Sequence, residues 1–81
     1  MEAGFFKMEN VTTVTKLNSI VQARGYALEV VENFVAQHPD TRKENIEKAT
    51  KMILKCRTPI ELGINMSNFL LAHPSEGLKR I

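Results

Sequence analysis

The sequence predicts a small all-α domain, a bundle of three helices or, if the first of them breaks, of four. Apolar residues recur at the three-and-four spacing of a helical face over approximately residues 11–37, 41–57 and 59–73. The first and third segments each end at a His-Pro pair, and the second and third each begin at a Thr-x-x-Glu pattern. Helical spacing bounded by helix start and stop signals therefore indicates helices along most of the chain.

The length of the chain sets the expected domain organisation. Its 81 residues have room for one domain, which we expect to cover residues 11–73. Residues 1–10 are predicted to form a flexible N-terminus and residues 74–81 a short basic C-terminal tail. A chain of this length buries only about 60–65% of the surface that it exposes when unfolded, so we expect a small stability margin.

The first predicted helix, residues 11–37, is the longest. Its apolar stripe is wider than one neighbouring helix would cover, which indicates two packing neighbours. Gly25 lies inside this pattern, where glycine costs about 0.5–1 kcal/mol relative to alanine, and we expect it to mark either a kink or the close approach of another backbone. A break at Gly25 would give four shorter helices around one core. The helix should end before Pro39, because proline disfavours the α conformation of the preceding residue.

Capping patterns start the second and third helices. In Thr41-x-x-Glu44 the hydroxyl and the carboxylate can each accept a hydrogen bond from an unpaired backbone N–H group. Thr58 and Glu61 repeat the pattern, with Pro59 at the first helical position, where its missing N–H is harmless. The second helix is amphipathic, and its predicted inward face consists of Ile46, Ala49, Met52, Ile53 and Cys56.

Two stretches of the chain resemble each other. Residues 33–39 and 68–74 share Asn-Phe and His-Pro at a spacing of 35 residues, and the similarity decays upstream. One interpretation is an internal duplication. The interpretation that the sequence favours is convergence of two helix ends, because two copies are fewer than the three that stacked helical repeats require.

The third predicted helix carries the main functional inference. It contains no Asp, Glu, Lys or Arg from Leu62 to Ser75. A helix that is apolar on most sides is normally buried on most sides. Because one side of every helix in a small bundle faces outward, an uncharged outer side indicates contact with a second chain. In the alternative, this helix packs deeply against the first one with its asparagines outward.

The length of the first predicted helix also indicates an interface with a second chain. A first helix of about 26 residues would be about 39 Å long and would extend beyond the shorter second and third helices. Symmetric contact with a second copy would cover the exposed apolar end. The expected partner or oligomer interface is Val14, Leu17, Val21, Leu62, Met66, Phe69 and Leu70.

We therefore expect a non-enzymatic helical module for protein interaction or regulation, of the adaptor or inhibitor type, acting as a homo-oligomer. The alternative is a protein that binds nucleic acid or a nucleotide phosphate through the basic face of the second helix. Glu44 and Glu47 interrupt that face, no aromatic residue on this helix offers a stacking surface, and the net charge is only +2. The expected phosphate-binding residues of this alternative are Arg42, Lys43, Lys48, Lys51, Lys55 and Arg57.

No catalytic, metal or cofactor site is expected. His38 and His73 each lie at a predicted helix end, where the helix dipole favours a protonated imidazole, and neither has companion ligands at the spacing of a metal site. Cys56 falls on the predicted core face of the second helix and is expected to act as a small buried apolar residue. The sequence also lacks a phosphate-binding glycine loop and a serine nucleophile elbow.

The expected location is cytoplasmic. A single cysteine agrees with a reducing compartment. The first residues carry an acid where a signal peptide has basic residues, and no apolar run reaches the length of a secretory or membrane-spanning segment. We therefore expect no membrane partner.

Overall fold

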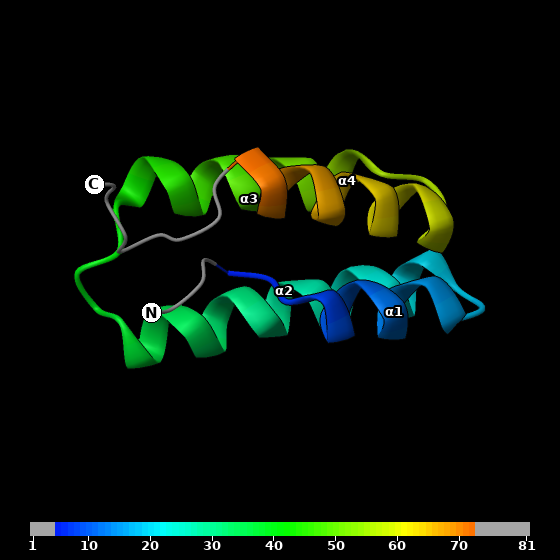
Figure 1. The fold of residues 1–81 in the computed structure, drawn as a ribbon, viewed down its shortest axis with the longest axis horizontal. Helices are drawn as coiled ribbons and strands as arrows, with labels where there is room; N and C mark the ends of the chain where they lie inside the picture. The colour runs from blue at the N-terminus through cyan, green and yellow to red at the C-terminus, as the bar shows by residue number, and fades with distance from the viewer. Residues whose placement is uncertain (1–4, 73–81) are drawn as a thin grey trace.

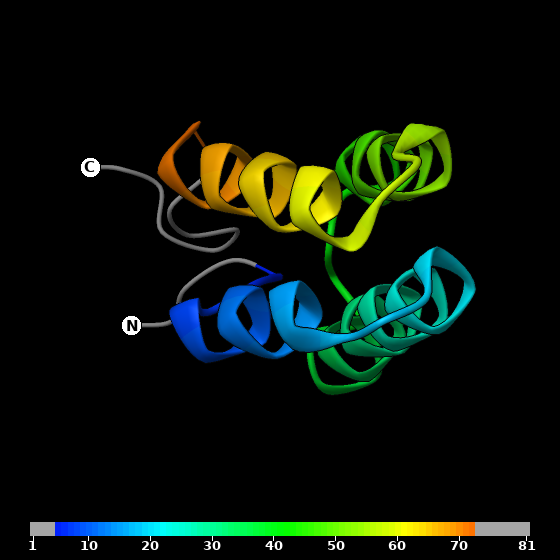
Figure 2. The same cartoon turned by 90° about the vertical axis from the view of Figure 1, so that its right-hand side faces the viewer.

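The structure is a computed structural model and describes residues 5–72. Over this range the chain forms four helices, α1 (Met8–Lys16), α2 (Ile20–Gln37), α3 (Lys43–Lys55) and α4 (Pro59–Ala72). Successive helices run in opposite directions, so that α1 and α2 form one hairpin and α3 and α4 form another (Figure 1). Viewed from its end, the bundle has α1 beside α2 and α4, and α3 on the opposite corner (Figure 2). The predicted all-α fold class is confirmed.

The first predicted helix is two helices, and the break lies at residues 17–19 rather than at Gly25. Ser19 has an extended backbone (φ −126°, ψ 134°), and its hydroxyl oxygen accepts hydrogen bonds from the backbone N–H groups of Val21 (3.1 Å) and Gln22 (3.4 Å). These bonds start α2. Gly25 lies exposed within α2, and among the described residues nothing is within 4 Å of the position that a Cβ would take. Gly25 therefore marks neither a break nor a close approach.

The folded domain begins before residue 11. Phe5 and Phe6 are 4% and 1% exposed and belong to the core. The ring of Phe5 packs edge-on against Phe34, with the centroids 5.0 Å apart, and Phe6 does the same with Phe69 at 5.7 Å. The prediction of a flexible N-terminus is therefore wrong for residues 5–10, because two aromatic side chains anchor this segment against α2 and α4.

The capping pattern at α4 is confirmed with one change of partner. The hydroxyl oxygen of Thr58 accepts a hydrogen bond from the backbone N–H of Glu61 at 3.0 Å. The carboxylate of Glu61 accepts one from the backbone N–H of Arg57 at 2.9 Å, one residue before the expected donor. The described part of α4 reaches Ala72, and the predicted tail 74–81 lies outside the described residues.

The capping pattern predicted for α3 is wrong. The hydroxyl of Thr41 donates a hydrogen bond to the carbonyl oxygen of His38, and it does not cap the helix. The N-cap residue is Arg42 rather than Thr41, and it makes no side-chain capping bond, so that the first helical residue is Lys43. Thr41 instead closes the turn between the two hairpins, at the end of the bundle opposite the other two loops (Figure 1).

The core lies between the two hairpins. It takes side chains from all four helices as well as the two N-terminal phenylalanines. The predicted inward face of the second helix is confirmed on α3, with Ile46 half-buried and the other four members buried. The buried apolar side chains of the helices and of the turn after α3 are Val14, Ala23, Ala27, Val31, Ala49, Met52, Ile53, Cys56, Leu62 and Met66.

The two hairpins correspond to each other at the spacing seen in the sequence. The first helices of the hairpins begin at Met8 and Lys43, which are 35 residues apart, whereas these helices end at Lys16 and Lys55 and the second helices begin at Ile20 and Pro59, which are 39 residues apart. Several buried positions correspond at the 35-residue spacing, whereas the turns within the two hairpins do not. Core pairs at this spacing are Val14 and Ala49, Ala27 and Leu62, Val31 and Met66, and Phe34 and Phe69.

Candidate functional site

Three of the predicted interface residues belong to the core of the domain. Val14, Leu62 and Met66 are 0% exposed. The chain reverses direction after α1, and α1 lies along α4. These residues are buried because each of the two helices covers the inner side of the other. The assignment of these three residues to an intermolecular interface is therefore wrong.

The other four predicted interface residues have different environments. Phe69 packs against the rings of Phe5 and Phe6 and is half-buried. Leu17 and Leu70 are also half-buried, and Leu17 packs against the core. Only Val21 projects into solvent, with 71% of its surface exposed, and it lies at the start of α2. The predicted residues therefore do not form one continuous surface.

Helices α1 and α4 approach each other closely at Gly63. A Cβ added at Gly63 would lie 3.0 Å from Cγ2 of Thr15 and 3.7 Å from the carbonyl oxygen of Val11. Glycine at this buried position lets the two helices pack tightly. The close backbone approach that the sequence suggested as one possibility for Gly25 occurs at Gly63 instead. The signal available in the sequence was a glycine next to Leu62, in a helix segment without charged residues.

We expect that replacing Gly63 with valine will lower the free energy of unfolding by about 1–3 kcal/mol, because the added carbons overlap Thr15. The change also removes a helical glycine, which offsets at most about 1 kcal/mol of this loss. Urea denaturation followed by circular dichroism measures the difference. The matched control is Gly25→Ala, which should raise stability by about 0.5–1 kcal/mol because its site is open. A stable Gly63→Val protein would contradict the close approach of α1 and α4.

The side of α4 that faces away from the core exposes two isoleucines beside Glu61 and Asn68. Ile60 and Ile64, one helical turn apart, are 61% and 56% exposed. Met8 in α1 is 58% exposed and lies seven residues before Thr15, so it projects from the side of α1 that is next to α4. We call Ile60 and Ile64 the α4 patch. The most exposed apolar residues of this helix are therefore not the residues that the sequence predicted.

A groove of about 540 Å³ lies on the opposite side of the bundle, between α2 and α3. Its walls are mostly apolar, and one carboxylate and one hydroxyl group lie among them. We call this feature the α2/α3 groove. It is lined by Leu28, Val31, Glu32, Val35, Ala36, Ile46 and Thr50.

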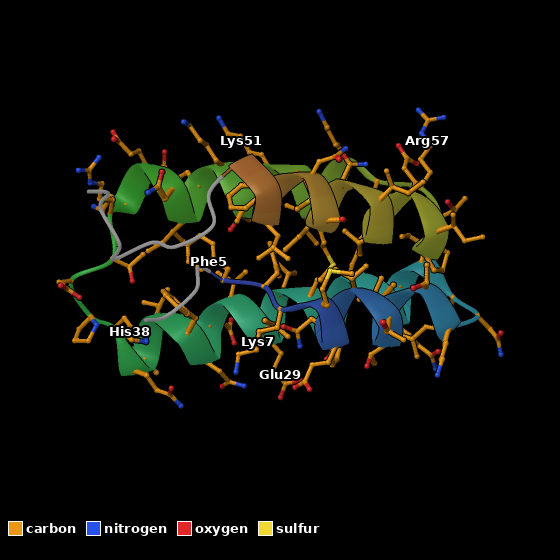
Figure 3. The ribbon with its side chains drawn as sticks, viewed as in Figure 1. Phe5, Lys7, Glu29, His38, Lys51 and Arg57 are labelled. Atoms are coloured by element: carbon orange, nitrogen blue, oxygen red, sulfur yellow. The ribbon has the colours of Figure 1, made fainter. Side chains whose placement is uncertain are left out.

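The predicted phosphate-binding residues are all exposed, and three of them share one side of α3. Lys48, Lys51 and Lys55 follow the spacing of one helical side, and Lys51 and Arg57 project away from the bundle (Figure 3). Glu44 lies one turn before Lys48 on the same side, and its carboxylate is 4.0 Å from the guanidinium of Arg42. The basic residues therefore form a mixed, solvated surface rather than a pocket.

Cys56 is a buried thiol at the end of α3. It is 0% exposed, and its Sγ donates a hydrogen bond to the carbonyl oxygen of Met52 at 3.2 Å. Burial raises the pKa of the Cys56 thiol and the nearby Glu61 raises it further, while Lys55 and Arg24 act in the opposite direction. Arg24 also donates a hydrogen bond to the backbone carbonyl of Cys56 at 2.6 Å, which ties α2 to the end of α3. This environment disfavours the reactive thiolate.

We expect Cys56 to react slowly with Ellman's reagent at mildly alkaline pH in the folded protein and rapidly in urea. Burial blocks access, and the raised pKa keeps the thiol protonated. Because the pKa is higher in the folded state, the same group should make the free energy of unfolding fall as pH rises past the usual thiol pKa. Equal reaction rates in the two states would show that the thiol is accessible.

His38 lies exposed in the turn after α2. Its ring stacks on Phe34, with the centroids 4.3 Å apart and the planes inclined by 30°. Within residues 5–72 there is no group of three or more His, Cys, Asp or Glu side chains that could hold a metal ion. The other predicted helix-end histidine, His73, lies outside the described residues.

Between residues 5 and 72 no helix is both long enough and apolar enough to cross a membrane. Comparison of the chain with models of known protein families, with curated proteins and with solved structures gave no match. Two described surfaces of the bundle are candidates for an interaction site, the α4 patch and the α2/α3 groove.

Proposed function

We propose that the chain is a non-enzymatic helical interaction module that binds a second copy of itself through the α4 patch. The observation that carries the proposal is the exposure of Ile60 and Ile64 on a helix that has no charged residue from Leu62 to Ala72. Charged residues are depleted in the centres of protein interfaces, and exposed apolar surface next to an uncharged helix side is typical of them. A regulatory role of the adaptor or inhibitor type, in the cytoplasm, follows as a further expectation.

A symmetric dimer suits the position of this patch. Helix α4 occupies one corner of the bundle, so that two copies related by a two-fold axis can place the same patch against itself (Figure 2). Each isoleucine that becomes buried contributes roughly 1 kcal/mol or more. Four such side chains supply about 4–6 kcal/mol, much of which the loss of rotational and translational freedom offsets. We therefore expect weak, concentration-dependent association rather than an obligate dimer.

Sedimentation velocity over a range of protein concentrations tests the proposal. The Ile64→Asp variant should remain monomeric where the wild type associates, because the new carboxylate would be desolvated in the interface. Leu54→Asp is the matched control, since Leu54 is 54% exposed and lies on α3. Its association should equal that of the wild type. Unchanged association of Ile64→Asp, with the helical content of both variants intact, would show that the α4 patch is not the interface.

The competing proposal is binding of nucleic acid or another phosphate ligand by the basic side of α3. The observation that supports it is the shared exposure of Lys48, Lys51 and Lys55 on one side of the helix. Three phosphate contacts to duplex DNA would make affinity fall about 40-fold between roughly 50 and 200 mM salt. A filter-binding titration of the wild type and Lys51→Glu measures this dependence. Binding that is absent, or that does not respond to salt, would exclude this proposal.

A further inference from the structure

The segment between α1 and α2 is compatible with a helix as well as with the observed turn. Residues 17–19 contain neither glycine nor proline, and within residues 5–72 no backbone φ angle is positive. Leu17 (φ −74°, ψ 150°) and Ser19 (φ −126°, ψ 134°) are extended. The apolar spacing from Val14 through Leu17 to Val21 is that of a helix. The sequence at the turn therefore also suits a continuous helix from α1 into α2.

Local hydrogen bonds hold the turn. The hydroxyl oxygen of Ser19 accepts hydrogen bonds from the backbone N–H groups of Val21 (3.1 Å) and Gln22 (3.4 Å). The backbone N–H of Leu17 donates to the carbonyl oxygen of Val14 at 3.1 Å. A continuous helix would replace these bonds with bonds from each N–H group to the carbonyl four residues before it. Because local bonding is satisfied in both forms, the packing of α1 decides between them.

The surface that receives α1 belongs to α2 and α4, which lie on either side of it (Figure 2). The side-chain amide of Asn10 donates a hydrogen bond to the hydroxyl of Tyr26 in α2 at 2.9 Å. Thr15 lies against Gly63 of α4, where a Cβ would come within 3.0 Å of its Cγ2. A second copy of the chain presents the same surface, so the same contacts are available between chains. The aromatic part of this surface consists of Phe34 and Phe69.

We infer that α1, together with Phe5 and Phe6, exchanges between two copies of the chain, with residues 17–19 as the hinge. In the exchanged dimer residues 8–37 form one helix of about 45 Å. Helix α1 of each copy then takes the place on α2 and α4 of the other copy that it has on its own chain in the monomer. This exchange uses the inner side of α4, so it goes beyond the proposed association through the α4 patch and does not depend on it.

The exposure of Val21 supports this inference. Val21 lies two residues after the hinge, and 71% of its surface is exposed. In a dimer with a two-fold axis the hinges of the two copies lie side by side. Leu17 and Val21 are one turn apart in the continuous helix, and there they would be covered by the same residues of the other copy. The exchanged dimer therefore buries apolar surface that the monomer leaves in water.

Proline at residue 20 tests the hinge. Ser19 has the extended backbone of a residue that precedes proline, and the first position of a helix accepts proline, so Ile20→Pro retains the turn of the monomer. In the continuous helix the same proline removes a backbone hydrogen bond and clashes with the preceding turn. We expect the variant to weaken the exchanged dimer about a hundredfold or more. Ile20→Ala is the matched control, because it removes the same side chain and keeps the N–H group. Its dimer should be at least as stable as that of the wild type.

Size-exclusion chromatography measures the exchanged dimer after the full chain is refolded from urea at high concentration and then diluted. We expect a dimer that separates slowly, because each α1 must leave a folded core before it returns to its own chain. Ser19→Ala should strengthen the dimer about tenfold or more, since it removes the cap of α2 in both chains. Ile64→Asp should leave the dimer unchanged.

Three outcomes of this measurement would overturn the inference. The first is a wild type that refolds only to monomer. The second is an equal amount of dimer in Ile20→Pro and Ile20→Ala. The third is loss of the slowly separating dimer in Ile64→Asp, which would place the contact on the α4 patch. Loss of the rapid, weak association alone in Ile64→Asp would support the proposed function and leave the exchanged dimer intact.

A disulfide shows whether α1 of one chain lies on α4 of another. Thr15→Cys in one chain and Gly63→Cys in a second, both combined with Cys56→Ala, bring two sulfurs within bonding reach only in the exchanged dimer. We expect the mixture to form an intermolecular disulfide under mild oxidation, and each variant alone to remain monomeric. Circular dichroism first establishes that both variants are folded. A folded mixture without the disulfide, or equal cross-linking of either variant alone, overturns the inference.

Discussion

Leu62→Asp should unfold the protein, whereas Ile64→Asp, two residues further along the same helix, should leave it folded. Leu62 is 0% exposed in the core and Ile64 is 56% exposed on the α4 patch. Removing the buried leucine costs about 2–5 kcal/mol, and an unpaired buried carboxylate costs several more. A chain of this length has a stability of only about 4–12 kcal/mol. Circular dichroism with urea denaturation measures both variants.

The contrast between these two variants tests which side of α4 faces the core. Ile64→Asp should change the free energy of unfolding by less than about 1 kcal/mol, because its carboxylate remains in water. Similar stabilities for the two variants would mean that α4 is rotated relative to the described packing. Unfolding of both would move Ile64 into the core and remove the main support for the proposed interface.

The second large effect is expected at the N-terminus. Phe6→Ala should lower the free energy of unfolding by about 3–5 kcal/mol, since Phe6 is 1% exposed and its ring packs edge-on against Phe69 at 5.7 Å. Thermal and urea denaturation measure the loss. Met8→Ala is the control, because Met8 lies two residues later and is 58% exposed. Its effect should be within about 0.5 kcal/mol.

A loss of less than about 1 kcal/mol in Phe6→Ala would contradict the burial of the N-terminal segment. The segment would then be separate from the helical bundle, as the sequence suggested. A large loss would show that the domain includes residues that precede the first helix. Phe5 offers a second test, since its ring also packs against Phe34 at 5.0 Å.

The sequence was sufficient for the fold class, for the start of α4 and for the inward face of α3. Thr58, Pro59 and Glu61 combine three local signals that do not depend on the rest of the fold, and the structure starts α4 at Pro59. The inward face of α3 was also predictable, because its charged residues occupy one side only. Local hydrogen bonding and a clear amphipathic pattern therefore sufficed for these elements.

The break between α1 and α2 was harder to predict, because the apolar spacing continues through it. Val14, Leu17 and Val21 follow helical intervals although residues 17–19 are not helical. The available signal was Ser19 followed by Gln22, a serine N-cap pattern without glycine or proline nearby. Whether such a pattern interrupts a long helix depends on tertiary packing, here the position of α1 along α4.

The interface residues were mispredicted for a related reason. Helix α4 is apolar on nearly all sides, so its sequence does not distinguish the inner residues Leu62 and Met66 from the outer residues Ile60 and Ile64. The distinction depends on which neighbours cover the helix. The start of the first predicted helix was expected to overhang the bundle, whereas the chain reverses after α1, and α1 covers the inner side of α4.

The solution mass of the wild-type chain, measured by light scattering over a wide range of concentrations, tests the proposed self-association most directly. The monomer mass is 9.2 kDa. We expect the measured mass to rise toward twice this value with concentration and to respond little to salt, because the α4 patch is apolar. A mass of 9.2 kDa at every concentration and salt level would contradict self-association through the α4 patch.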